Sequence, residues 1–302
     1  MSFTAKDVQA LRERTNCGMM DCKKALVSAD GDMEKAIEFL RERGLAAAAK
    51  KAGRIAAEGI VYASVDEAEK IGVIVEVNSE TDFVAKNADF QSFVKICADT
   101  IAKGNPADVE ALLAMKAEGS QFTIADLLRE KILTIGENLK VRRFARLTGE
   151  TVTYIHGGGR IGVLVQFETD CAGKDGFKAY AKDIAMQIAA ANPQFLDRTS
   201  IPAAVIEEEK KVLTAQAVNE GKPLNIAEKV VVGRISKFFK DSCLLEQEYI
   251  KDTDLTVTKF TEQTQKELGG SIKVTAFVRF EKGEGLQKRE DNFAQEVADM
   301  VK

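Results

Sequence analysis

The sequence predicts an α+β fold: a small N-terminal three-helix module, two related α+β subdomains with antiparallel sheets, a protruding antiparallel helical hairpin and a C-terminal helix. Three observations support this prediction. Apolar residues recur at helical spacing at the start of the chain, and the period changes to strand-like alternation from Glu58. A strand-and-helix pattern then recurs about 90 residues later, and a strand-free helical stretch interrupts this second copy.

The N-terminal module begins with two predicted helices. Thr4 and Asp7 resemble a capping box that opens the first helix, which would end near Thr15 and Asn16. A second helix is expected over Met19–Ala29. Its inward-facing residues would be Met19, Cys22, Ala25 and Leu26.

A third helix and a tether complete the module. Asp32 is expected to cap this helix, and Gly44 stands where a left-handed C-terminal cap belongs. Its apolar residues at helical spacing are Met33, Ala36, Ile37 and Leu40. The Ala-rich, basic residues 45–54 are expected to form a helical or flexible tether.

The first subdomain opens with a predicted β-hairpin. Alternation at Ile60 and Tyr62 and the β-branched run Ile71–Val77 predict two strands around a turn at Asp66–Lys70. A helix over Ala88–Ala102 would pack on the sheet. The further expected elements are helices over Pro106–Met115 and Thr123–Leu133 and a strand over Leu139–Leu147.

The second copy follows the same order of elements. After a strand over Val152–His156, the run Ile161–Val165 matches Ile71–Val75 at an offset of 90 residues. The next helix matches at an offset of 87, because Phe177 stands where the first copy has Phe90. The loop between strand and helix is therefore three residues shorter in the second copy.

The remaining elements interrupt and then complete the second copy. Two helical stretches on either side of Asn219–Pro223 predict an antiparallel hairpin, with Phe238 and Phe239 at its base. The elements expected after it are strands over Cys243–Tyr249 and Ser271–Arg279 that complete the sheet, a helix over Val257–Leu268 and an amphipathic tail helix over Asp291–Lys302.

These elements predict six consecutive units. They are a UBA-like three-helix module with its linker, the first subdomain, the first part of the second subdomain, the hairpin, the completion of the second subdomain and a C-terminal helical module. Their predicted bounds are 1–54, 55–147, 148–201, 202–240, 241–282 and 283–302.

Composition argues against several classes of function. A formal net charge of -4, a pI near 5.5 and mixed signs argue against a protein that binds nucleic acid or an anionic membrane directly. No apolar run is long enough to span a membrane and the start lacks a signal or transit peptide, so a cytoplasmic location is predicted. The odd, scattered set of five cysteines is typical of reduced thiols.

No motif predicts a metal, a cofactor or an active site. Cys17 and Cys22 have the spacing of a zinc half-site, but no second pair of ligands follows. Gly157–Gly162 matches the dinucleotide-binding spacing, but a strand follows these glycines, which favours a hairpin turn. An enzyme centred on the sole histidine, His156, stays an alternative for which no second catalytic group can be named.

The loop Thr81–Val84 is the strongest candidate for a functional site, because loops between strands and helices commonly carry function. Burial of Phe83 in the core would be the ordinary expectation for a large aromatic residue. The second copy, however, closes with Thr169–Lys174, which is shorter and has no aromatic residue. The fold therefore does not require Phe83, and we expect its side chain to serve a partner protein.

The residues around this loop resemble the bacterial elongation factor Ts family. The run Glu76–Lys86 matches the family pattern E-x-N-x-x-T-D-F-V-[AS]-K, and Leu11–Leu26 is similar to its N-terminal signature. Other similar segments are Thr134–Asn138, Asn219–Pro223 and Phe238–Gln247. The residues that depart from the family's usual sequence are Asn16, Leu224, Tyr249 and Ile250.

The resemblance implies a translation elongation factor that is not an enzyme, needs no cofactor and exchanges guanine nucleotide on elongation factor Tu. It implies that Thr81, Asp82, Phe83 and Val84 bind this partner and dislocate its Mg2+. The further partner contacts that it implies are Arg12, Met19, Met20, Ile135, Gly136 and Asn138. A non-exchanging adaptor or chaperone-like factor is the alternative function, and a homodimer of heterodimers is an open arrangement.

Overall fold

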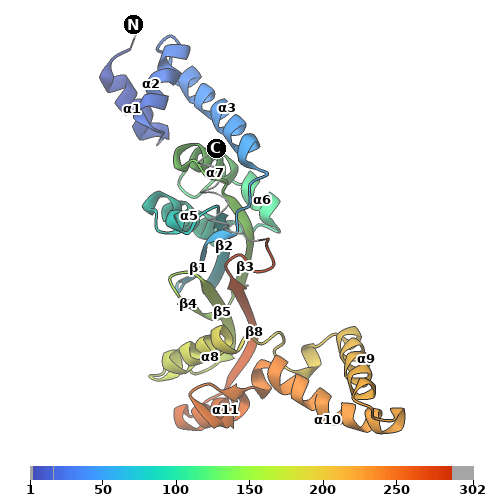
Figure 1. Cartoon of the computed structure of the whole chain (residues 1–302). Helices are drawn as coiled ribbons and strands as arrows, with labels where there is room; N and C mark the ends of the chain where they lie inside the picture. Colours follow the sequence, from blue (N-terminus) through green and yellow to red (C-terminus); the bar gives the residue numbers. More distant parts are fainter. Residues whose placement is uncertain (1–2, 16, 288–302) are drawn as a thin grey trace.

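The computed structural model describes residues 3–15 and 17–287 of the 302-residue chain. Its helices and small antiparallel sheets confirm the predicted α+β class. Figure 1 shows the N-terminal helices at one end, the two main sheets in the middle, and a helical hairpin that projects sideways near the other end. Asn16 and the tail helix predicted over Asp291–Lys302 lie outside the described residues.

The N-terminal module is formed by α1 (Ala5–Thr15), α2 (Met19–Ser28) and α3 (Met33–Lys51). The predicted capping box at Thr4 and Asp7 is present, since each residue's backbone N–H donates to the other's side chain. The expected inward position of Met19 is wrong, because this side chain is 55% exposed. The buried face of α2 starts one turn later, at Cys22, so the first turn of the helix extends beyond the module's core.

The expectation that α3 ends at Gly44 is also wrong. The helix continues to Lys51, because the Ala-rich residues after Gly44 have high helix propensity. Gly44 is buried against α7 (Ile124–Ile135), where a Cβ atom would lie 3.5 Å from Cβ of Arg129. Residues 45–51 of the tether thus continue α3 and pack along the first subdomain.

The first subdomain is built on an antiparallel sheet in the order β1 (Glu58–Asp66), β2 (Ile71–Ser79) and β3 (Lys140–Thr148). Helices α5 (Ala88–Gly104), α6 (Val109–Ala114) and α7 cover one face of it. The predicted hairpin, helices and third strand are confirmed within a few residues at each end. Phe90, Phe93 and Ile101 of α5 are fully buried against the sheet.

The second sheet repeats this arrangement with β4 (Glu150–His156), β5 (Ile161–Thr169) and β8 (Ile272–Glu281). Helix α8 (Phe177–Ala191) covers its outer face as α5 covers the first sheet. Across the opposite faces the two sheets pack together through Val61, Ile74, Leu164 and Phe280. The molecule therefore has a central pair of sheets between two layers of helix (Figure 1).

The expected strand over Cys243–Tyr249 does not join the second sheet. The segment instead forms the 3-10 turn η2 (Leu244–Glu246) and the strand β6 (Glu248–Tyr249), which pairs with β7 (Asp252–Thr256) before α11 (Val257–Leu268). The side-chain amide of Gln247 donates to the backbone carbonyls of Ala191 and Asp241, which holds the segment away from the sheet.

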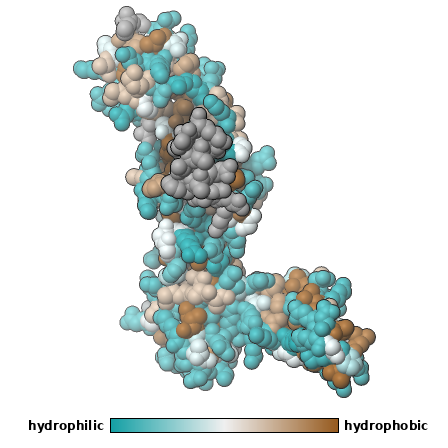
Figure 2. Space-filling model, viewed as in Figure 1, coloured by the Kyte–Doolittle hydropathy of each residue, from teal (hydrophilic) through white to brown (hydrophobic). Residues whose placement is uncertain are grey.

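The helical hairpin consists of α9 (Ala203–Asn219) and α10 (Leu224–Ser242), as the sequence predicts. Leu213, Val231 and Ile235 form its small core, and Phe238 and Phe239 pack against them at the base. Figure 2 shows apolar residues on its surface near the free end. Across residues 3–15 and 17–287, no helix combines the length and the apolar character needed to cross a membrane.

Candidate functional site

The candidate loop leaves β2 and forms a single short turn of helix, α4 (Asp82–Ala85), before α5. Phe83 is 78% exposed, the highest value among the large apolar side chains of the described chain. Asp82 is also exposed, whereas Val84 is only 6% exposed and packs into the core of the first subdomain. The turn therefore presents an aromatic ring and a carboxylate to solvent, and Val84 anchors it from below.

Glu137, which follows the end of α7, holds the start of this turn. Its Oε2 accepts hydrogen bonds from the backbone N–H groups of Glu80 and Thr81, both at 3.0 Å. Its Oε1 accepts one from the hydroxyl of Thr81 at 2.7 Å. One carboxylate thus binds the loop at three points. Sequence reasoning did not identify this residue, because its partners lie 56 and 57 residues away in the chain.

Glu80 binds back to the segment that carries Glu137. Its Oε1 accepts the backbone N–H of Asn138 at 2.6 Å and lies 3.4 Å from Nη1 of Arg54. Asn138 Nδ2 in turn donates to the carbonyl of Arg54 at 2.8 Å. We call Glu80, Thr81, Glu137 and Asn138 the clasp, because two loops far apart in sequence are joined by reciprocal hydrogen bonds.

The structure separates the other predicted contacts into two groups. Ile135 and Gly136 lie beside the clasp at the end of α7, and Asn138 belongs to the clasp in the connection to β3. Asn138 is buried, and its side chain binds within the chain. The second group, Arg12, Met19 and Met20, is exposed on the N-terminal module.

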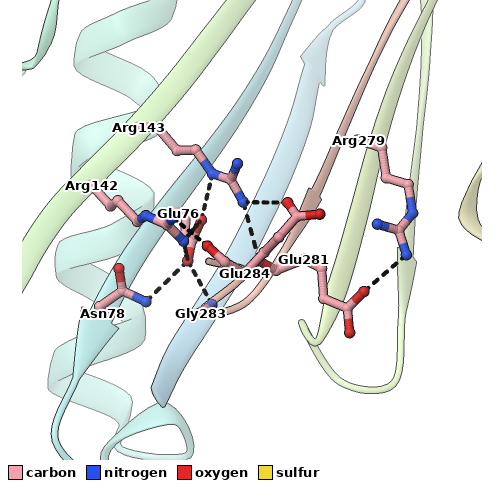
Figure 3. A network of polar contacts seen from close by, with 8 residues as sticks. All are labelled: Glu76, Asn78, Arg142, Arg143, Arg279, Glu281, Gly283 and Glu284. Atoms are coloured by element: carbon pink, nitrogen blue, oxygen red, sulfur yellow. Dashed lines mark hydrogen bonds and ion pairs between the residues drawn. The ribbon is translucent and has the colours of Figure 1, made fainter. Parts of the chain in front are cut away.

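Figure 3 shows a second polar cluster at Glu76 of β2, whose side chain is fully buried. Its carboxylate accepts hydrogen bonds from the side chains of Asn78, Arg142 and Arg143 and from the backbone N–H of Gly283. Burial alone would raise the pKa of Glu76, but the Gly283 N–H and the three side-chain donors outweigh burial and lower it.

The same arginines bind the turn that follows β8. Arg142 donates to the carbonyl of Glu284, and Arg143 donates to the carbonyl of Glu281 at 3.1 Å. Arg143 also forms an ion pair with the Glu284 carboxylate at 3.1 Å. The cluster therefore links the first sheet to the end of the second, which the sequence pattern does not reveal (Figure 3).

The remaining motifs have structural roles. Gly157 and Gly158 adopt positive φ angles of 59° and 64° in the turn between β4 and β5, which confirms the predicted hairpin. All five cysteines are buried free thiols, and burial raises the pKa of Cys97 to about 12 and that of Cys17 to about 11. No group of three or more His, Cys, Asp or Glu side chains in the described ranges could hold a metal ion.

Comparison with known proteins agrees with the sequence resemblance. The family model described as Elongation factor TS matches residues 80–284. The chain is 53% identical over 301 residues to "Elongation factor Ts" of Clostridium perfringens (strain SM101 / Type A), covering 99% of both chains. It is 51% identical over 303 residues to the protein of the same name from Clostridium kluyveri (strain ATCC 8527 / DSM 555 / NBRC 12016 / NCIMB 10680 / K1), with 99% of both chains covered. It is 50% identical over 305 residues to the one from Syntrophotalea carbinolica (strain DSM 2380 / NBRC 103641 / GraBd1), with 100% of both chains covered. The chain belongs to the elongation factor Ts family of translation elongation factors.

Proposed function

We propose that this chain promotes exchange of GDP for GTP on elongation factor Tu by binding to it, and that it is not an enzyme. Family membership supports the partner, and the exposure of Phe83 on a held loop is the observation that carries the mechanism. Phe83 would insert into the partner's packing and displace the groups that hold Mg2+ and the β-phosphate. Asp82 would add negative charge where anions are already bound.

The energetics are favourable for such a role. An exposed phenylalanine leaves about 2 kcal/mol of burial unused in the free protein. A pocket on the partner can recover this free energy, which is how aromatic residues become interface hot spots. Binding of factor and binding of nucleotide then weaken each other equally. Every 1.4 kcal/mol or so of this coupling makes nucleotide binding tenfold weaker.

The six other predicted contacts extend this proposal. Arg12, Met19 and Met20 would hold the partner's nucleotide-binding domain through the N-terminal module, together with Ile135 and Gly136 beside the loop. The second subdomain would hold a distal domain of the partner. Asn138 would act by supporting the loop, since its side chain already binds Arg54.

Substitution of Phe83 by alanine tests the proposal. The measurement is the rate at which labelled GDP leaves GDP-loaded elongation factor Tu. We expect the acceleration of this rate by Phe83→Ala to be at least about tenfold smaller than that by the natural chain, because the hot-spot contact is lost. The free energy of unfolding should not fall, because the ring is exposed. Val232→Ala, which removes another exposed apolar side chain from the helical hairpin, is the matched control and should keep the full rate.

Two outcomes would decide against this mechanism. A full exchange rate with Phe83→Ala would show that the ring is not needed. Binding to elongation factor Tu without any acceleration by the natural chain would favour the non-exchanging adaptor. Excess GDP with Mg2+ should dissociate the complex, since the coupling acts in both directions.

A further inference from the structure

The clasp around Glu137 replaces the ordinary cap of α4. Thr81 is the N-cap residue of this short helix, a position from which a threonine hydroxyl usually accepts a hydrogen bond from the helix. The Thr81 side chain makes no such bond and donates its hydroxyl hydrogen to Glu137 instead. The direction in which α4 leaves β2 is therefore set by a carboxylate from another element.

Few other contacts hold this turn. Helix α4 has four residues, which is too short for a helix to be stable on its own. Phe83 contributes little burial, since its side chain is 78% exposed. Val84 in the core and a hydrogen bond from the Gln91 side chain to the carbonyl of Ala85 hold the C-terminal half of α4. The three hydrogen bonds to Glu137, together with one from the Ser79 hydroxyl to the carbonyl of Thr81, hold the start of the turn.

The second copy of the fold offers an internal comparison. There Thr169, the last residue of β5 as Ser79 is the last of β2, donates its hydroxyl hydrogen to the carbonyl of Ser271, and Asp170 accepts the backbone N–H of the same serine. That loop is closed by its own side chains against β8, and it presents no aromatic residue. In the first copy, which exposes Phe83, a carboxylate from another element, that of Glu137, binds the loop instead.

Glu137 itself is held from both sides. It follows Gly136, which ends α7 with a positive φ of 89° and leads into the connection to β3. Asn138, on its other side, binds Glu80 and Arg54. The carboxylate is thus presented by a short connection that is fixed at each end.

We propose that Glu137 is the positioning residue of the exchange site, which orients Phe83 before the partner arrives. This inference rests on the proposed function of Phe83. A loop that already has its binding conformation avoids the cost of ordering on association. Without the clasp, only a fraction of molecules would present Phe83 correctly, and the apparent activity would fall by that fraction.

Exchange kinetics with four variants test this proposal. We expect Glu137→Ala to lower the accelerated rate of GDP release from elongation factor Tu about tenfold, through the reduced competent fraction. Glu137→Gln should stay within about threefold of the natural chain, because its amide oxygen can still accept both backbone N–H groups. In a Phe83→Ala background, Glu137→Ala should cause no further loss, since its effect passes through the ring.

Asp197→Ala is a matched control. Asp197 accepts hydrogen bonds from the backbone N–H groups of Thr199 and Ser200 and from the Thr199 hydroxyl. Glu137 likewise binds two backbone N–H groups and one threonine hydroxyl. The bonds of Asp197 stay within its own loop and do not involve the clasp, so its loss should leave the orientation of Phe83 and the exchange rate unchanged. Hydrogen exchange supplies a second readout: the amides of Glu80 and Thr81 should lose protection in Glu137→Ala, whereas those of α5 should keep it.

Each contrary result has a distinct meaning. A full rate with Phe83→Ala overturns both the proposed loop mechanism and this inference. A slow Phe83→Ala with a full-rate Glu137→Ala overturns this inference alone, as does an equal loss in Asp197→Ala or a further loss in the double variant. If Glu137→Ala does not fold, Glu137→Met removes the same three hydrogen bonds and keeps a side chain of similar length, and a full rate for that variant would overturn the inference.

Discussion

At the scale of single residues, Glu76 shows how a buried charge is tolerated in this protein. A fully buried carboxylate is costly unless donors surround it, and removing either side of such a cluster leaves the other uncompensated. Glu76 has donors from β2, from β3 and from the turn after β8. Its loss would leave the mostly buried Arg142 guanidinium without its carboxylate and would leave Arg143 with that of Glu284 alone.

We therefore expect Glu76→Ala to lower the free energy of unfolding by about 3–5 kcal/mol. Denaturant unfolding followed by circular dichroism measures this change. Glu118→Ala removes an exposed carboxylate paired with Lys103 and should have little effect. Equal stability of the two variants would show that the buried cluster contributes nothing.

The lowered pKa of Glu76 also predicts a pH dependence. Because the folded state favours the charged form, the stabilisation is present above the ordinary glutamate value of 4.5 and is lost as pH falls below it toward the folded-state value. The difference in unfolding free energy between the natural chain and Glu76→Gln should therefore narrow between neutral pH and pH values below 4.5. A difference that stays constant with pH would contradict the assignment.

At the scale of elements, two glycines that both stand near the ends of predicted helices have different roles. Gly44 lies inside α3 with helical geometry and room for a Cβ atom, 3.5 Å from Arg129. Gly136 ends α7 with a φ of 89°, a conformation that disfavours other residues. The difference follows from what comes next: alanines continue α3, whereas the chain turns into the clasp after α7.

Alanine substitutions at these glycines should change stability in opposite directions. Gly44→Ala should raise the free energy of unfolding by about 0.5–1 kcal/mol, because it lowers the entropy of the unfolded chain and favours helix. Gly136→Ala should lower it by about 1–2 kcal/mol through left-handed strain. Thermal and denaturant unfolding of both variants measure these changes, and a destabilised Gly44→Ala would indicate that α3 and α7 need the glycine.

At the scale of the whole molecule, the repeat explains a pair of glycines between the sheets. Gly72 and Gly162 are equivalent at the offset of 90 residues, and each lies against side chains of the other sheet. A Cβ atom on Gly72 would lie 2.5 Å from Cδ1 of Leu164, and one on Gly162 would lie 2.5 Å from Cγ1 of Val61. The repeated glycine thus serves the packing of one copy on the other.

Gly72→Val should consequently lower the free energy of unfolding by about 1–3 kcal/mol, as overpacking of a core does. Gly233→Val is the control, since Gly233 on α10 has no atom within 4 Å of a Cβ position, and it should change stability by less than about 0.5 kcal/mol. Equal unfolding midpoints for the two variants would show that the sheets separate easily enough to admit the valine.

The sequence by itself determined the elements whose signals are local. Helical or alternating spacing of apolar residues, the cap at Thr4 and Asp7, and the turn at Gly157 act within a few residues, so they could be predicted correctly. The internal repeat also allowed the exposure of Phe83 to be predicted from the sequence, because two copies of one scaffold can be compared without knowing their contacts.

Only the tertiary structure decided which distant groups meet. The bonds from Thr81 to Glu137 and from Gly283 to Glu76 join residues 56 and 207 positions apart, and no periodicity encodes such pairs. The exposure of Met19 depended on where the core of the N-terminal module begins, and the path of Cys243–Tyr249 depended on the bonds that Gln247 makes to Ala191 and Asp241. Local preference selects helices and strands, whereas the final position of each side chain follows from packing and from satisfying buried polar groups across the whole chain.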